Sequence, residues 1–285
     1  MRHRLGPVLH LLLLSFLTSG CGLLEWKDKL LDVLVDRIPP EMEASLGQQI
    51  LPSVLPSEAT LRDAVLQRQL EGLLEPLLEK NAITQPKIRI YISREPALNA
   101  FAIPGGILIF NAGMLRASGS PEEILGVAAH EIAHATERHV VKSMIQSLSL
   151  AAIVSFFLGD ISGLGAYILH QSQMLLQNGF SRTQEAQADE VGFRYLVQAG
   201  VDPRGMSRFF ERIRAQKGEL EAQHAEGQKL ERMNALFSTH PLTQDRIRWV
   251  EERFAGLSSQ EKAKLRPVRF DLKAFQARLN QVVVP

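Results

Sequence analysis

The chain has 285 residues, of which 45% are hydrophobic and 22% are charged. These fractions are close to those of an average globular protein, and they exclude collagen-like, coiled-coil and intrinsically disordered chains. The formal net charge is +1. The first twenty residues contain Arg2 and Arg4 and no acidic residue, so the rest of the chain has 30 basic and 31 acidic side chains. A chain without excess positive charge is not expected to bind nucleic acid.

The first twenty residues have the order of a secretory signal, with a basic start, a leucine-rich stretch and small residues at the end. The apolar stretch, residues 5–17, is shorter than the roughly 20 residues that span a membrane. Cys21 is the only cysteine and follows Thr18-Ser19-Gly20 at the expected cleavage point. An internal disulfide is therefore excluded, and the segment is expected to be an export signal.

This cleavage point resembles a bacterial lipobox, in which the cysteine thiol receives diacylglycerol. Thr18 departs from the pattern, because an aliphatic residue is usual three positions before the cysteine. The resemblance implies a lipid anchor at Cys21, and Gly22 after it favours the outer membrane; several acyl chains give stable anchoring. A free cysteine beside an ordinary cleavage site is the alternative.

Apolar side chains at helical spacing predict two helices in the first third of the mature chain. One covers residues 25–38 and ends before Pro39-Pro40, and the other covers residues 57–80. Pro76 is expected to kink or end the second helix. Two short strands follow, over residues 88–92 and 100–110. Pro104-Gly105-Gly106 interrupts the second and predicts a bend or a hairpin in an edge-like strand.

Two capping signals predict the helices that carry the chemistry. Ser120-Pro121-Glu122-Glu123 is a Ser-x-x-Glu capping box with proline at the first helical position. Ser181-Arg182-Thr183-Gln184 is a second capping box, and its helix should run to about Ala199 before Gly200 ends it.

The first of these helices contains the motif His130-Glu131-Ile132-Ala133-His134. Residues four apart lie on one helical face with Cβ atoms roughly 5 to 6 Å apart, so His130 and His134 can both reach one metal ion. Glu131 points aside, where it can hold the attacking water and take its proton. A solvated surface helix is disfavoured, because the neighbouring residues are mostly alanine, valine and isoleucine.

A catalytic zinc ion held by two histidines needs a third protein ligand. The second helix offers Glu185 and Asp189 on one face, whereas Glu190 falls off that face. We assign Glu185 to the metal, and Asp189 to a hydrogen bond with a ligand histidine or to proton transfer. An exposed acidic helix would be the preferred interpretation without the upstream histidines.

Four ordered motifs carry a resemblance to a known family: residues 99–106, HEIAH, SRTQEAQAD, and Ser238-Thr239-His240-Pro241. Over residues 88–250 the chain resembles the zinc metallopeptidases of the HtpX and CAAX-prenyl-endopeptidase type, particularly the periplasmic branch that includes the β-barrel assembly-enhancing protease. The tetratricopeptide repeats of some relatives do not follow. The resemblance implies a gluzincin endopeptidase with one Zn2+ on His130, His134 and Glu185 and with catalysis by Glu131.

Metzincins match less well, because they need a third histidine where Val140 stands; His139 is one residue early. His240 is interpreted as a site residue that stabilises the oxyanion or occupies the open position of zinc, and a structural or solvated loop histidine is the alternative. Arg246 could polarise a substrate carbonyl, although a surface arginine is favoured. Residues 148–158 are apolar and favour core packing, with a membrane-contacting lid as the alternative.

The sequence therefore predicts a mainly α fold with a small β-sheet (α+β). We expect a signal in residues 1–20, a tether with helices in 21–56, a metallopeptidase domain in 57–256 and a helical extension in 257–285. The predicted protein is a lipid-anchored zinc endopeptidase that hydrolyses peptide bonds of extracytoplasmic proteins, namely misfolded or envelope proteins. An edge strand around residues 102–110 is expected to pair with the substrate. A latent, chaperone-like zinc lipoprotein and a structural zinc protein with four ligands are the rivals.

Overall fold

The computed structural model describes residues 31–147, 179–222, 240 and 244–283. The chain divides into two compact units, Met1–Pro39 and Pro40–Pro285. In the first unit, residues 31–36 are helical, which agrees with the helix expected ahead of Pro39. Cys21 and the apolar residues 148–158 lie outside the described parts of the chain.

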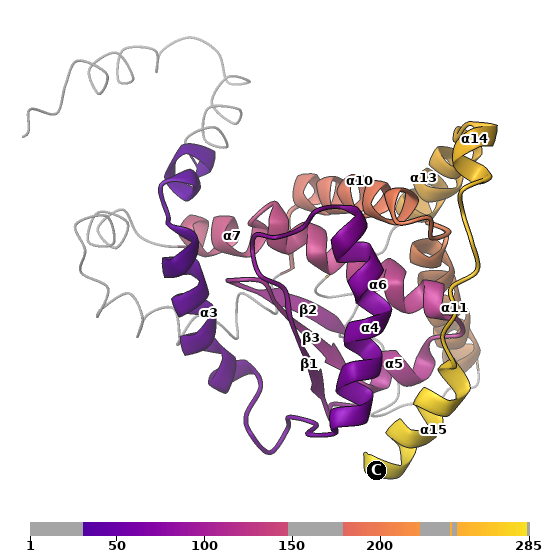
Figure 1. Cartoon of the computed structure of the whole chain (residues 1–285), viewed down its shortest axis with the longest axis horizontal. Helices are drawn as coiled ribbons and strands as arrows, with labels where there is room; N and C mark the ends of the chain where they lie inside the picture. The colour runs from indigo at the N-terminus through magenta and orange to yellow at the C-terminus, as the bar shows by residue number, and fades with distance from the viewer. Residues whose placement is uncertain (1–30, 148–178, 223–239, 241–243, 284–285) are drawn as a thin grey trace, which may run out of the picture. The chain divides into compact units, whose positions relative to one another are not determined.

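The second unit is mostly helical and contains a small three-stranded sheet, which confirms the predicted fold class (Figure 1). Its elements in chain order are α3 (Pro40–Val54), α4 (Ala64–Lys80), β1 (Arg89–Ser93), β2 (Ala100–Ile103), β3 (Ile107–Asn111), α5 (Ala112–Ala117), α6 (Pro121–Thr136), α7 (His139–Ser147), α10 (Arg182–Gln198), α11 (Gly205–Ala222), α13 (Gln244–Ala255), α14 (Ser259–Lys262) and α15 (Leu272–Val282). Among the described helices, none is both long and apolar enough to cross a membrane.

The sheet has the strand order β1-β3-β2, with β1 parallel and β2 antiparallel to β3. Gly105 and Gly106 form the turn between β2 and β3 with φ angles of 75° and 74°, a region that favours glycine. The predicted edge strand over residues 102–110 is wrong in one respect. Every residue of β3 is buried at the centre of the sheet, so within residues 102–110 only the part that belongs to β2 lies at a sheet edge.

Helix α6 lies at the centre of the second unit and packs against α4, α10, α11 and β2. Its residues from Glu123 to Ala135 are all buried. Ser120 caps its start by accepting a hydrogen bond from the Glu123 amide at 3.3 Å. The reciprocal half of the predicted capping box is wrong, because the Glu123 carboxylate accepts from the Gly119 amide and from Arg212 instead.

Helix α10 begins with both hydrogen bonds of the predicted capping box, between Ser181 and Gln184. It approaches α6 closely at Gly192, where a Cβ atom would stand 3.1 Å from the Ala129 carbonyl and the His130 amide. Small residues along this contact let the two helices that carry the expected ligands meet face to face. Gly200, with a φ angle of 72°, follows the end of the helix as predicted.

Two helices near the start of the second unit differ from the prediction. α4 begins after Asp63, whose carboxylate accepts from the Val65 and Leu66 amides at 3.0 Å, and not at residue 57. It continues through Pro76 to Lys80, so the expectation that this proline might end it is wrong. α3 was not predicted, although Pro40 occupies its first position, where proline is tolerated.

Candidate metal centre

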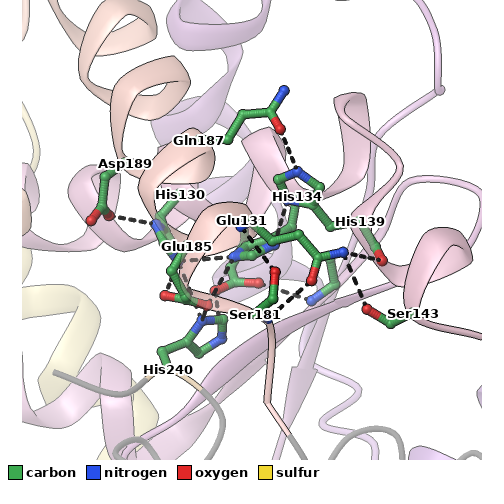
Figure 2. Close-up of polar contacts among 12 residues, drawn as sticks. His130, Glu131, His134, His139, Ser143, Ser181, Glu185, Gln187, Asp189 and His240 are labelled. Carbon is green, nitrogen blue, oxygen red and sulfur yellow. Dashed lines mark hydrogen bonds and ion pairs between the residues drawn. The ribbon is translucent and has the colours of Figure 1, made fainter. Parts of the chain in front are cut away.

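Four buried side chains from three parts of the chain converge on one point (Figure 2). His130 and His134 come from α6, Glu185 from α10, and His240 from the chain ahead of α13. One ligand atom from each lies within 4.8 Å of the others. The structure thus brings the three expected ligands together and places His240 beside them.

The distances between these atoms match those of a tetrahedral zinc site. Ligands about 2.0 to 2.1 Å from a tetrahedral zinc ion stand roughly 3.3 Å apart. The Nε2 atoms of His130 and His134 are 3.0 Å apart, and each lies 3.5 Å from a Glu185 oxygen. The Nδ1 atom of His240 is 3.3 Å from His130 Nε2 and 2.9 Å from Glu185 Oε1. This donor set fits a single zinc ion, with imidazole and carboxylate as its ligand types.

On one side of the cluster, His130 is oriented by charged groups. Asp189 Oδ1 lies 3.0 Å from His130 Nδ1, and Arg246 donates to both oxygens of Asp189 at 2.7 and 2.8 Å. A carboxylate only accepts, so Nδ1 of His130 carries a proton, and Nε2 is the ring nitrogen that faces the cluster. Burial opposes the charge of His130, but the Asp189 and Glu185 carboxylates raise its pKa to about 9.

Arg246 is part of the site, and its favoured interpretation as a surface arginine is wrong. Its side chain is 12% exposed and contacts Glu185 as well as Asp189. Burial acts against the charge of Glu185, yet the surrounding histidines hold the pKa of this carboxyl well below its usual range. The pKa of Asp189 is lowered too, because His130 and Arg246 outweigh its burial.

On the other side, the Nδ1 edge and the face of the His134 ring contact uncharged groups. Its Nδ1 atom lies 3.0 Å from His139 Nδ1, and Phe180 stacks on it with ring centroids 3.9 Å apart. Burial lowers the pKa of His134 well below its usual range. Sequence reasoning considered His139 only as a misplaced third ligand and did not consider Phe180. No spacing rule could have paired residues five apart, because the chain bends between α6 and α7.

Glu131 lies between the cluster and the sheet. Its Oε2 atom accepts a hydrogen bond from the Ala102 amide of β2 at 3.0 Å, and its Oε1 atom is 3.3 Å from His240 Nε2. Burial raises the pKa of this carboxyl. Glu131 is therefore fixed beside the ligands without being one of the four converging donors.

The backbone of β2 alternates in direction, as in any strand. The Asn111 amide donates to the Asn99 carbonyl, so Asn99 faces β3. Ala100 and Ala102 then face away from β3, which agrees with the bond from Ala102 to Glu131. The outward edge of β2 thus runs past the Glu131 carboxylate.

Comparison with known proteins explains this arrangement. Residues 62–254 match the profile described as Peptidase family M48. The chain belongs to peptidase family M48. The match contains three of the converging side chains on α6 and α10, together with His240 and Arg246.

Several curated proteins are similar to the chain. The mitochondrial metalloendopeptidase OMA1 of Schizosaccharomyces pombe is 29% identical over 74% of this chain and 57% of its own length. The putative β-barrel assembly-enhancing protease of Vibrio cholerae is 26% identical over 75% of this chain and 44% of its own length. The metalloprotease LoiP of Escherichia coli is 28% identical over 63% of this chain and 67% of its own length. The chain spans about half the length of the first two relatives.

Proposed function

We propose that this protein is a zinc endopeptidase that hydrolyses internal peptide bonds of polypeptides. The main support for this proposal is the position of the Glu131 carboxylate between the ligand cluster and β2. This buried carboxylate lies between the converging His130, His134 and Glu185 and the outward edge of β2. A general base beside a metal site and a strand edge suits metal-assisted hydrolysis of an extended peptide.

The edge of β2 supports binding of an extended polypeptide. The outward backbone groups of Ala100 and the outward carbonyl of Ala102 can pair with a substrate strand, while the Ala102 amide donates to Glu131. Such pairing gives affinity with little sequence preference. When bound, zinc supplies a Lewis acid that polarises a carbonyl and lowers the pKa of water. Glu131 would take the proton of the attacking water at Oε1 and return it to the leaving amine. Its raised pKa helps it to keep that proton between the two steps.

His240 supports two roles, which lead to two candidate functions. Its Nε2 atom, close to Glu131 Oε1, can donate to an oxyanion that forms there. Its Nδ1 atom completes a set of four protein donors, as in closed zinc sites without an open position. The closed set favours a second candidate, a latent zinc-binding protein of chaperone-like function.

Glu131→Gln tests the proposal, because it keeps the side-chain shape and removes the base. We expect zinc to stay bound, and casein hydrolysis to fall on the order of 100- to 10,000-fold. Wild-type hydrolysis should also stop when a chelator removes zinc. Hydrolysis that survives in Glu131→Gln, or loss of zinc from the folded variant, would contradict the role of Glu131. A zinc-loaded wild type that does not cleave casein would favour the latent protein.

We further propose that the protein works in the bacterial cell envelope, anchored to the outer membrane through a lipid on Cys21, with misfolded or envelope proteins as substrates. The leader-like first twenty residues support this location, and so do the bacterial relatives, among them one named for β-barrel assembly. Residues 57–256 would form the catalytic domain and residues 257–285 a helical extension.

Labelled fatty acid tests the anchor. It should be incorporated into the wild-type protein and not into Cys21→Ser. An unlabelled wild-type protein with a free Cys21 thiol would refute the lipoprotein assignment, whatever the fractionation shows.

A further inference from the structure

His139 is a buried titratable residue that the hydrolytic mechanism does not use. It opens α7 and is fully buried beside the ligand His134, with the two Nδ1 atoms 3.0 Å apart. Its other ring nitrogen, Nε2, lies 3.2 Å from Gln187 Oε1 on α10. It contributes none of the four converging donor atoms, so its contacts require another explanation.

The proton positions along these hydrogen bonds follow from the last residue in the series, Glu137. The Gln187 amide group donates from Nε2 to the Glu137 carboxylate at 2.6 Å, and a carboxylate only accepts. Gln187 therefore presents its oxygen to His139, and Nε2 of His139 carries the proton. His139 is fully buried, and its two ring nitrogens contact an amide oxygen and an imidazole rather than a carboxylate, so the ring is neutral and its Nδ1 atom is an acceptor.

His134 must then donate from Nδ1 to His139. In a neutral imidazole with its proton on Nδ1, the Nε2 atom has a free lone pair. That atom is the one that faces the Nε2 of His130 and the carboxylate of Glu185. The three hydrogen bonds thus point away from the cluster and end on the carboxylate of Glu137, the residue that follows α6.

We propose that His139 is a positioning residue that fixes the tautomer of His134 and so prepares its Nε2 atom for zinc, with Gln187 and Glu137 setting the direction of the hydrogen bonds. The inference rests on the zinc site of the proposed function and not on hydrolysis.

The backbone is shaped to bring His139 back to His134. Arg138, between α6 and α7, has a φ angle of 57°, a left-handed conformation that is unfavourable for a residue with a side chain. Glu43 of α3 holds Arg138 through an ion pair at 2.8 Å. Gln184 of α10 donates to the His139 carbonyl at 3.4 Å. Contacts from two other helices therefore maintain the bend that places His139.

The test compares variants that differ in their ability to accept a hydrogen bond from His134. His139→Phe keeps a ring and has no acceptor, whereas His139→Gln restores an acceptor oxygen. We expect His139→Phe to weaken zinc binding on the order of 10- to 100-fold in competition with a chelator, and His139→Gln to recover most of that loss. Gln187→Leu, at an exposed position where folding is not at risk, should weaken binding by less than His139→Phe.

Nitrogen NMR of the zinc-free protein provides a second measurement, the tautomer of His134, which does not depend on enzyme activity. The wild type should show His134 protonated at Nδ1, and His139→Phe should show a mixture of tautomers. Tyr195→Phe is the matched control, because it also removes an α10 to α6 hydrogen bond, from Tyr195 to Thr136, outside this set of contacts. It should leave zinc affinity unchanged.

Three results would overturn the proposal: a wild-type His134 protonated at Nε2, unchanged zinc affinity in His139→Phe or Gln187→Leu, or an equal loss of affinity in Tyr195→Phe. If His139→Phe does not fold, the proposal is tested by the tautomer of His134 in the wild-type spectrum and by the zinc affinity of Gln187→Leu. A wild type that binds no zinc would refute the proposed function instead, and the tautomer of His134 would still be measured.

Discussion

The two ligand histidines of α6 are four residues apart, yet their surroundings differ in charge. His130 donates to Asp189, which Arg246 holds through two further hydrogen bonds. His134 donates to His139, an uncharged ring that in turn donates to an amide. Both arrangements direct an Nε2 atom at the same point. The orientation of His130 depends on ionic contacts, and the orientation of His134 depends on neutral ones.

The difference predicts how each side responds to change. Removing one partner of a buried ion pair leaves an uncompensated charge and costs about 3 to 5 kcal/mol. Removing one partner of a neutral hydrogen bond leaves an unsatisfied polar group and costs about 1 to 3 kcal/mol. The ionic side also ties the ligands to α13 through Arg246, whereas the neutral side ties them to α7 through His139. The His130 side should therefore matter more for stability.

The largest effect is expected at Glu185, whose carboxylate oxygens lie 3.5 Å from the Nε2 atoms of both histidines. Glu185→Ala should remove most of the bound zinc, because it deletes a ligand atom from the tetrahedral set. Elemental analysis of the purified protein measures this. Glu190→Ala is the control on the same helix, since Glu190 pairs with Arg253 away from the cluster, and its zinc content should equal that of the wild type. Equal zinc in Glu185→Ala and the wild type would refute the ligand assignment.

The next prediction compares the loss of a buried ion pair of α13 with the loss of an exposed ion pair of the same helix. Arg246→Met leaves Asp189 and Glu185 buried without their cation, and we expect the free energy of unfolding to fall by about 3 to 5 kcal/mol. Arg253→Met removes a pair whose arginine side chain is 54% exposed, and it should cost less than about 1 kcal/mol. Urea denaturation of zinc-free protein gives both values. Similar losses in the two variants would contradict the ionic character of the His130 side.

The smallest effect is a pH dependence of opposite sign on the two sides. In zinc-free protein the pKa of His130 is raised from 6.5 to about 9, despite burial, by Asp189 and Glu185. Its contribution to stability is complete below pH 6.5 and is lost as the pH rises through 9. Burial lowers the pKa of His139 to about 4, so its contribution is complete above pH 6.5 and is lost as the pH falls through 4.

Each contribution is on the order of 3 kcal/mol at full size, since one pKa unit corresponds to about 1.4 kcal/mol. Asp189→Asn should flatten the alkaline decline in the free energy of unfolding, and His139→Gln should flatten the acid decline. Urea denaturation in chelator between pH 4.5 and 9.5 measures both. An alkaline decline of wild-type size in Asp189→Asn would show that His130 does not depend on the ionic side.

Much of the candidate site could be predicted because its signals are local. Ser120 and Ser181 cap their helices as the sequence indicates. Four-residue spacing then places His130 with His134 on one face of α6, and Glu185 with Asp189 on one face of α10. The turn at Gly105 and Gly106 and the two strands around it were also predictable, since both glycines need positive φ angles. α3 escaped prediction because Pro40 and Pro52 lie within its bounds, and proline usually signals the end of a helix.

The sequence by itself determined the kinds of donor atom and their order along two helices, because helix caps and four-residue spacing act within a few residues of one another. The tertiary structure alone decided which distant groups complete the site. Arg246 is buried because α13 packs against α10, where Asp189 and Glu185 face it. His139 reaches His134 because contacts with other helices hold the left-handed turn at Arg138. Such contacts join residues far apart in the chain, and their energies depend on burial, which no local pattern specifies.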